Sequence, residues 1–127
     1  MSLRTNLITY LGELIPTVTG LEDVNVIPSV RDVGELSKPV LIVKTNAFRK
    51  LPEAPRSKFI ADFTLTLVSP HQDVNKAEDD LEARLELLLP HLFTWGMSWQ
   101  SADQAQFSES RLCYDIQLTS IYQITEG

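Results

Sequence analysis

Two hydrophobic periods meet in the stretch from Lys58 to Leu92. Between Phe59 and Val68 apolar and polar residues alternate, and the apolar face carries Phe59, Ala61, Phe63, Leu65 and Leu67. A period of two is typical of a strand that buries one face. From Val74 onward the apolar residues recur at intervals of three and four, namely Val74, Ala77, Leu81, Leu85 and Leu88. That spacing predicts an amphipathic helix.

The ends of this helix carry several signals. Ser69 and Pro70 match a capping box with proline in the first helical position, and Asp73 is a second possible N-cap. The sequence leaves both starts open. Pro90 lacks an amide hydrogen and disfavours a helical residue before it, so we expect it to end the helix or to permit one further turn.

The same two periods predict elements before this unit. A leucine stripe predicts a helix over Leu3–Ile15, and the alternation in Asp23–Ile27 predicts a short edge strand. Val40–Thr45 is apolar enough for a strand covered on both faces. It would form a hairpin with Phe59–Val68 around a protruding loop at about 46–58, which is longer than a hairpin needs.

Two further strands are predicted after the helix. Phe93–Gln100 alternates, with Phe93, Trp95, Met97 and Trp99 on one face, and Ser101–Ser108 is polar and turn-like. Arg111–Ile124 alternates along its whole length. It exceeds the usual strand length, so we expect a bend, a bulge or an overhang there.

The resulting order is α-β-β-β-α-β-β. It predicts an α+β fold in which two helices pack on one face of a mostly antiparallel sheet of about four to five strands. With 127 residues, 43% of them hydrophobic, the chain has the size and composition of a single domain spanning residues 1–127. Its single cysteine, Cys113, cannot form an intramolecular disulfide. No apolar run approaches the roughly 18 residues of a membrane span, and the N-terminus does not read as a signal peptide.

Charge is distributed unevenly over a net of −6. Residues 44–58 carry a net of +4 from Lys44, Arg49, Lys50, Arg56 and Lys58 against one acid. Residues 69–92 carry a net of −4, with the acidic helix face at Asp79, Asp80, Glu82 and Glu86. Two such surfaces can attract each other between copies, and Phe48 in the loop suits a contact made in an assembly. The alternative is that both are solvated surfaces and that Phe48 folds back onto the sheet.

Candidate chemistry is sparse. His71 and His91 stand at the two ends of the predicted helix, and the clustered acids point in different directions, so neither set forms a metal or catalytic site. Phosphate-binding glycine motifs are absent from the sequence. Trp95 and Trp99 could form an aromatic platform, but their spacing favours an apolar sheet face. We therefore expect neither catalysis nor a cofactor. The basic loop could line a DNA passage when several copies surround it.

The succession of elements resembles the tail terminator, or tail-completion, proteins of long-tailed double-stranded DNA bacteriophages. The resemblance covers nearly the whole chain. It lies in the helix LRTNLITYLGELI, in the hairpin KPVLIVKTNAFRKLPEAPRSKFIADFTLTLVSP, in the helix DVNKAEDDLEARLELLLPHL and in the long final strand. Its most specific part is the strand ending in LTLVSP, followed by an acidic leucine-rich helix.

The resemblance implies a structural virion protein rather than an enzyme. Its copies would form a ring, typically six-fold, on the tail tube, ending tube polymerisation and presenting a surface to the head connector. The partners implied are further copies, the tube protein, the connector and passing double-stranded DNA, contacted non-specifically at most. The location would be the virion tail or neck, reached from the host cytoplasm during assembly. Another neck or minor tail component, such as a head–tail joining protein, and a small-ligand or peptide-binding α+β module are the alternatives.

Overall fold

The computed structural model of the chain describes residues 3–28, 38–50, 58–108 and 111–123. The helices in these ranges are α1 (Leu3–Leu14) and α2 (Val74–Thr94), with a 3₁₀ turn, η1 (Ile15–Thr17), after α1. The strands are β1 (Asn25–Ile27), β2 (Val40–Lys50), β3 (Lys58–Val68), β4 (Ser98–Ser108) and β5 (Arg111–Gln123). This confirms the α+β class and the order α-β-β-β-α-β-β.

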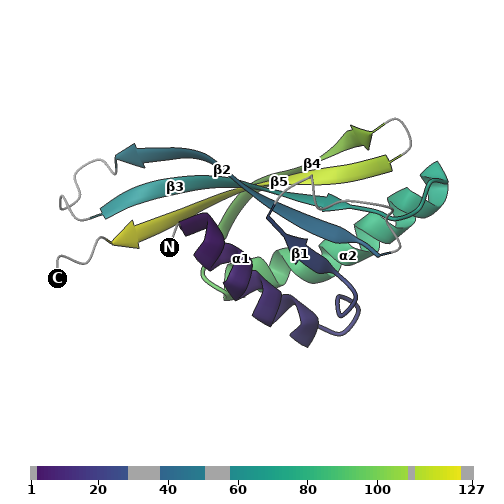
Figure 1. The fold of residues 1–127 in the computed structure, drawn as a ribbon, viewed down its shortest axis with the longest axis horizontal. Coiled ribbons are helices and arrows are strands. Elements are labelled where there is room, and N and C mark those ends of the chain that lie inside the picture. Colours follow the sequence, from purple (N-terminus) through teal and green to yellow (C-terminus); the bar gives the residue numbers. More distant parts are fainter. Residues whose placement is uncertain (1–2, 29–37, 51–57, 109–110, 124–127) are drawn as a thin grey trace.

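The strands form a five-stranded sheet in the order β1-β2-β3-β5-β4. β1 runs parallel to β2, and every other neighbouring pair is antiparallel. Both helices lie on the same side of the twisted sheet (Figure 1). As a result, one face of the sheet is packed against α1 and α2, and the other face has neither helix on it.

The main core fills the space between the helices and the sheet. The alternating face of β3 supplies Ala61, Phe63, Leu65 and Leu67, and the helices supply Leu7, Leu11, Leu81, Leu85, Leu88 and Leu92. The two periods select most of these residues, but Leu92 lies beyond the predicted stripe, and Val74, which belongs to the stripe, is exposed. A helical stripe and a strand face of this kind bury each other because each is apolar on one side only.

A second apolar cluster lies on the opposite face at one end of the sheet. It consists of Ile27, Val40, Ile42, Val68 and Cys113. Cys113 is therefore buried among apolar side chains at this end of β5. Burial, with a smaller contribution from Asp115, raises the pKa of the Cys113 thiol to about 11, which keeps it protonated and unreactive near neutrality.

The ends of α2 resolve the open question about its start. Asp73 is the N-cap, and its side chain accepts a hydrogen bond from the Lys76 amide at 3.1 Å. Ser69 instead donates its hydroxyl to Asp80 at 3.3 Å. Pro90 lies inside the helix, which continues for one further turn to Thr94 and is followed by Gly96 at a positive φ of 85°.

Three predictions about strands are wrong. Phe93–Gln100 is not one strand, because Phe93 and Thr94 still belong to α2, and a turn separates them from β4. Ser101–Ser108 is not a turn but most of β4, a polar strand at the edge of the sheet. Asn46–Lys50 is not loop either: β2 runs on to Lys50 after an irregularity between Thr45 and Ala47, so the strands flank only residues 51–57.

Candidate assembly surfaces

Three strands continue past the rest of the sheet. We call residues 46–50, 58–62 and 119–123 of β2, β3 and β5 the three-strand extension. β1 pairs with β2 only over Val40–Ile42, and the pairing of β4 with β5 reaches no further than Thr119. Among the described residues, the extension therefore has two unpaired strand edges. In Figure 1 it projects beyond both helices at the end of the sheet where β2 ends and β3 begins.

Large apolar side chains are exposed on both faces of the extension. Phe48 lies on the face that α1 and α2 cover further along the sheet, and it is 61% exposed. Its ring meets that of Phe59 edge-to-face, with the two centroids 5.8 Å apart. Ile121 is also 61% exposed. It pairs with Ile60, and both side chains lie on the opposite face of the sheet. Both faces thus offer apolar surface that this chain alone does not bury.

Arg49 and Asp62 form an ion pair across the extension. Arg49 Nε and Nη2 donate to the two carboxylate oxygens of Asp62 at 2.6 and 3.0 Å, and Thr119 Oγ1 donates to Asp62 Oδ1 at 2.9 Å. The Arg49 hydrogen bond holds the pKa of Asp62 below its ordinary value. These bonds connect all three strands, so Arg49 is engaged within its own chain rather than being a free cation.

The other basic residues of the hairpin differ from Arg49. Lys44 and Lys50 are exposed on β2, and within the described part of the chain neither takes part in a salt bridge. Lys58 begins β3, and Arg56 lies outside the described residues. Of the predicted basic set, Lys44 and Lys50 are thus the two cations seen to be available to a partner.

The predicted acidic face of α2 also divides into two groups. Asp79, Glu82 and Glu86 are exposed. Asp80 is half-buried and accepts a hydrogen bond from Arg84 Nε at 3.0 Å, in addition to the one from Ser69. Asp80 therefore helps to hold α2 in place, and the other three acids point to solvent.

Arg84 anchors the segment between η1 and β1 to α2. Its guanidinium pairs with both carboxylate oxygens of Asp23 at 2.7 and 3.0 Å and donates to the Gly20 carbonyl at 3.3 Å. The hydrogen bond from Arg84 holds the pKa of Asp23 below its ordinary value. This network belongs to the covered part of the molecule and is far from the tip of the extension.

The basic and acidic surfaces lie at opposite ends of the molecule. The extension projects from one end of the long axis, and the N-terminal part of α2 lies toward the other (Figure 1). One copy cannot bring Lys44 or Lys50 onto its own acidic helix face. Opposite charges separated in this way can meet only between copies, in a head-to-tail contact.

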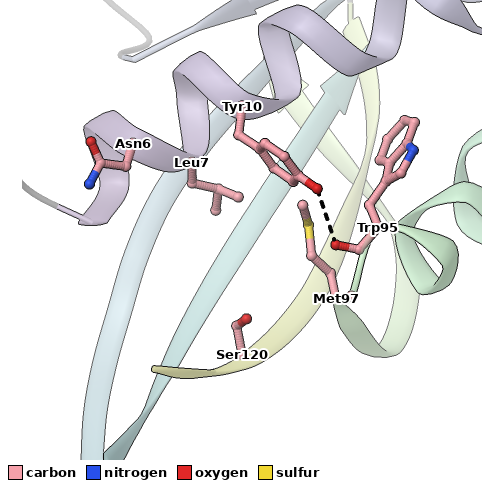
Figure 2. Close-up of a pocket in the computed structure, with 7 residues that line it drawn as sticks. Asn6, Leu7, Tyr10, Trp95, Met97 and Ser120 are labelled. Carbon is pink, nitrogen blue, oxygen red and sulfur yellow. Dashed lines mark hydrogen bonds between the residues drawn. The ribbon is translucent and has the colours of Figure 1, made fainter. Parts of the chain in front are cut away.

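A pocket lies beside the base of the extension, and nothing in the sequence pattern signals it. Its volume is about 380 Å³, and its lining comes from α1, from the turn between α2 and β4, and from β5: Asn6, Leu7, Tyr10, Trp95, Gly96, Met97 and Ser120. Figure 2 shows Leu7 and Tyr10 reaching from α1 toward Met97, with Ser120 on β5 below them. The Tyr10 hydroxyl donates to the Trp95 carbonyl at 3.5 Å. Trp95 and Trp99 do not share a sheet face as expected, because Trp95 lies in the turn after α2, and of the two only Trp95 lines this pocket.

Metal binding and membrane insertion are two other possibilities for the described residues. No group of three or more His, Cys, Asp or Glu side chains within them is placed to hold a metal ion. Among the same residues, no helix has the length and apolar character needed to cross a membrane. The chain matches no model of a known protein family and no curated protein sequence.

Proposed function

We propose that this chain is a structural protein that assembles with copies of itself into a ring at the end of a phage tail tube. The ring would end tube polymerisation and provide the interface to the head connector. Its expected six-fold symmetry comes from the resemblance of the sequence to tail terminator proteins. Its role is assembly and not catalysis. The observation that carries the proposal is the three-strand extension, whose apolar side chains and strand edges the chain does not cover.

The distribution of charge supports contacts between neighbours in a ring. A head-to-tail contact uses two different surfaces on each copy, and the arrangement closes when the rotation between copies is right. The extension provides one surface, with Phe48 and Lys50 exposed on the same face. The other surface would include the exposed acids of α2, since opposite fields favour correctly oriented encounter.

Lys44 and Lys50 are also the residues that we propose to face either passing DNA or an acidic neighbouring surface. Lys50→Glu is a cleaner test than reversal of Arg49, because a glutamate at position 49 would face Asp62 within the same chain. We expect Lys50→Glu to impair ring assembly or DNA passage while the monomer stays folded. Lys76→Glu, at an exposed lysine on α2, is the control for the same charge reversal at another site.

The direct experiment is to measure the mass of the purified chain by sedimentation velocity and to image it by negative-stain electron microscopy. We expect closed rings at high protein concentration or in the presence of tail tubes, and the chain in purified tails. A chain that stays monomeric under all these conditions and is missing from tails would contradict the proposal. Labelling within the particle distinguishes the tube end from another neck position, which is the alternative assembly role.

A further inference from the structure

The pocket beside α1 and the exposed Phe48 lie on the same face of the sheet. Ser120, which lines the pocket, pairs with Ala61, and Ala61 pairs with Phe48. These three residues therefore form one row across β5, β3 and β2. Neighbouring strands are about 4.8 Å apart, so the backbones at Phe48 and Ser120 are separated by roughly 10 Å.

Phe48 does not fill the pocket of its own chain. Its side chain stands on a strand that is fixed by pairing with β3, and its ring rests against the edge of Phe59. With 61% of its surface exposed, it is a prominent aromatic side chain at the edge of the sheet. Exposure of a phenyl ring to water is unfavourable, and covering the ring with another molecule would remove that cost.

The lining of the pocket suits a neutral aromatic group. Leu7 and Met97 are buried lining residues and Tyr10 contributes an aromatic ring, whereas the Trp95 indole points away from Met97 and Ser120 (Figure 2). None of the lining residues carries a charge. Apolar, aromatic and thioether surfaces favour contact with a phenyl ring. The volume of about 380 Å³ is at the small end of the range for ligand sites.

The charges beside the two features are complementary. Lys50 follows Phe48 on the same face of β2, and Glu13 lies one turn from Tyr10 on the same stripe of α1. Both side chains are exposed, and in the described part of the chain neither takes part in a salt bridge. Lys50 beside Phe48 and Glu13 beside the pocket could therefore attract each other between two copies. A second copy of this chain offers the surface that each feature needs.

We propose that Phe48 of one copy inserts into the pocket of a second copy, with Lys50 placed near Glu13 of that copy. This inference rests on the proposed self-assembly and identifies one of its contacts, in which Lys50 meets Glu13 of α1, so that the exposed acids of α2 belong to a different contact. It makes Phe48 the aromatic anchor of the interface, the kind of residue that carries a large share of binding energy. The pocket supplies the complementary surface, and the lysine–glutamate pair fixes the orientation.

Association of the variants tests the contact. We expect Phe48→Ala to weaken self-association by about tenfold or more, since truncating a central aromatic anchor costs more than about 1.4 kcal/mol. Ser120→Leu, which fills the pocket, is expected to give a similar loss. Phe93→Ala is the matched control, because Phe93 is 76% exposed but does not line the pocket. Equal association of the Phe48, Ser120 and Phe93 variants would overturn the inference.

A charge exchange tests the orientation. Lys50→Glu and Glu13→Lys are each expected to weaken association, and the double variant is expected to recover most of the loss. In addition, Lys50→Cys and Glu13→Cys chains can be mixed and treated with a short bis-maleimide crosslinker. We expect crosslinks between the two different chains and few within either chain alone. Cys113 does not interfere, because it is buried and its pKa is raised to about 11.

The outcomes separate this inference from the proposed function. If the wild-type chain forms rings, and the Phe48 and Ser120 variants form them equally well without crosslinking between the mixed chains, only the Phe48 contact is wrong. If the wild-type chain never associates, the proposed function fails with it. If the variants assemble normally but a titration with free indole shifts NMR resonances of the pocket residues, the occupant is a small aromatic ligand and not a second copy.

Discussion

The covered part of the sheet and the three-strand extension are made from the same strands, but their side chains have different surroundings. Where α1 and α2 lie over β3, Phe63 and Leu65 are almost fully buried. Further along the same pairing, Phe48 and Ile121 are mostly exposed. The difference shows that the strands are longer than the hydrophobic core of one chain requires. Length and apolar surface that do not stabilise the monomer point to contacts with other molecules.

Polar contacts differ between the two regions as well. In the covered part, Arg84 of α2 binds Asp23 and Gly20 in the segment between η1 and β1, and it also binds Asp80 of the same helix. In the extension, the Arg49–Asp62 pair and the Thr119 hydroxyl connect strands at the surface. A surface pair in water contributes little to stability. It does fix the shape of the extension, which favours a pre-organised binding surface.

Removing a large core side chain should have the largest effect. Phe63→Ala deletes a ring that is 1% exposed beneath both helices. We expect the free energy of unfolding to fall by about 3–5 kcal/mol, because apolar contacts are lost and a cavity remains. Urea denaturation followed by circular dichroism measures this change. A loss below about 1 kcal/mol would remove the basis for calling this region the core.

Breaking the Arg84 network should have an intermediate effect. Arg84→Gln leaves the half-buried Asp80 carboxylate and the Asp23 carboxylate without their cation. We expect a loss of about 1–3 kcal/mol in unfolding free energy, the usual cost of losing hydrogen bonds to charged groups. The same denaturation experiment applies. Lys76→Gln, which removes an exposed positive charge from the same helix, serves as the control and should be nearly neutral.

Acid should weaken the covered part through Asp23. Its pKa is lowered in the folded protein by the hydrogen bond from Arg84. A carboxyl group with a lowered folded pKa stabilises the fold above its unfolded pKa of about 4, and this stability is lost as pH falls through the folded pKa. We expect the fall in unfolding free energy below about pH 4 to be shallower in Asp23→Asn than in the wild type. Identical pH profiles would contradict a role for this pair.

Substitutions on the extension should have the smallest effect on the monomer. Ile121→Ser changes a residue that is 61% exposed on the face without helices. We expect the unfolding free energy to change by no more than about 0.5 kcal/mol in dilute solution. A loss comparable to that of Phe63→Ala would mean that the extension is part of the core, and the comparison between the two regions would no longer hold.

Much of the covered fold follows from sequence periodicity. The alternation of β3 and the stripe of α2 select core residues correctly because each pattern reports burial against a second element. Pro90 limits α2 to one further turn, as expected. The short strand β1 and the long strand β5 also agree with their patterns.

Periodicity fails where burial on one face no longer controls the sequence. Ser101–Ser108 is polar because β4 is an edge strand. A polar stretch of sequence without alternation cannot be told from a turn by its pattern. Asn46–Lys50 follows a register irregularity and lies past the helices. All of its side chains are exposed, so no buried face imposes an alternation of apolar and polar residues there. The alternation of Phe93 and Trp95 is too short to distinguish a strand from a helix end. In the structure, Phe93 belongs to the last turn of α2 and Trp95 to the turn that follows. The pocket draws on three distant segments, and no local pattern can join them.

Hydrogen–deuterium exchange, measured in dilute monomer and after assembly, tests most directly whether the extension is an interface. We expect the amides of residues 46–50 and 120–123 to exchange faster than those of Phe63 and Leu65 in the monomer, and to become protected on assembly. The amides in the covered part should change little. Equal protection of both regions in the monomer, with no further change in assembled material, would contradict an interface at the extension.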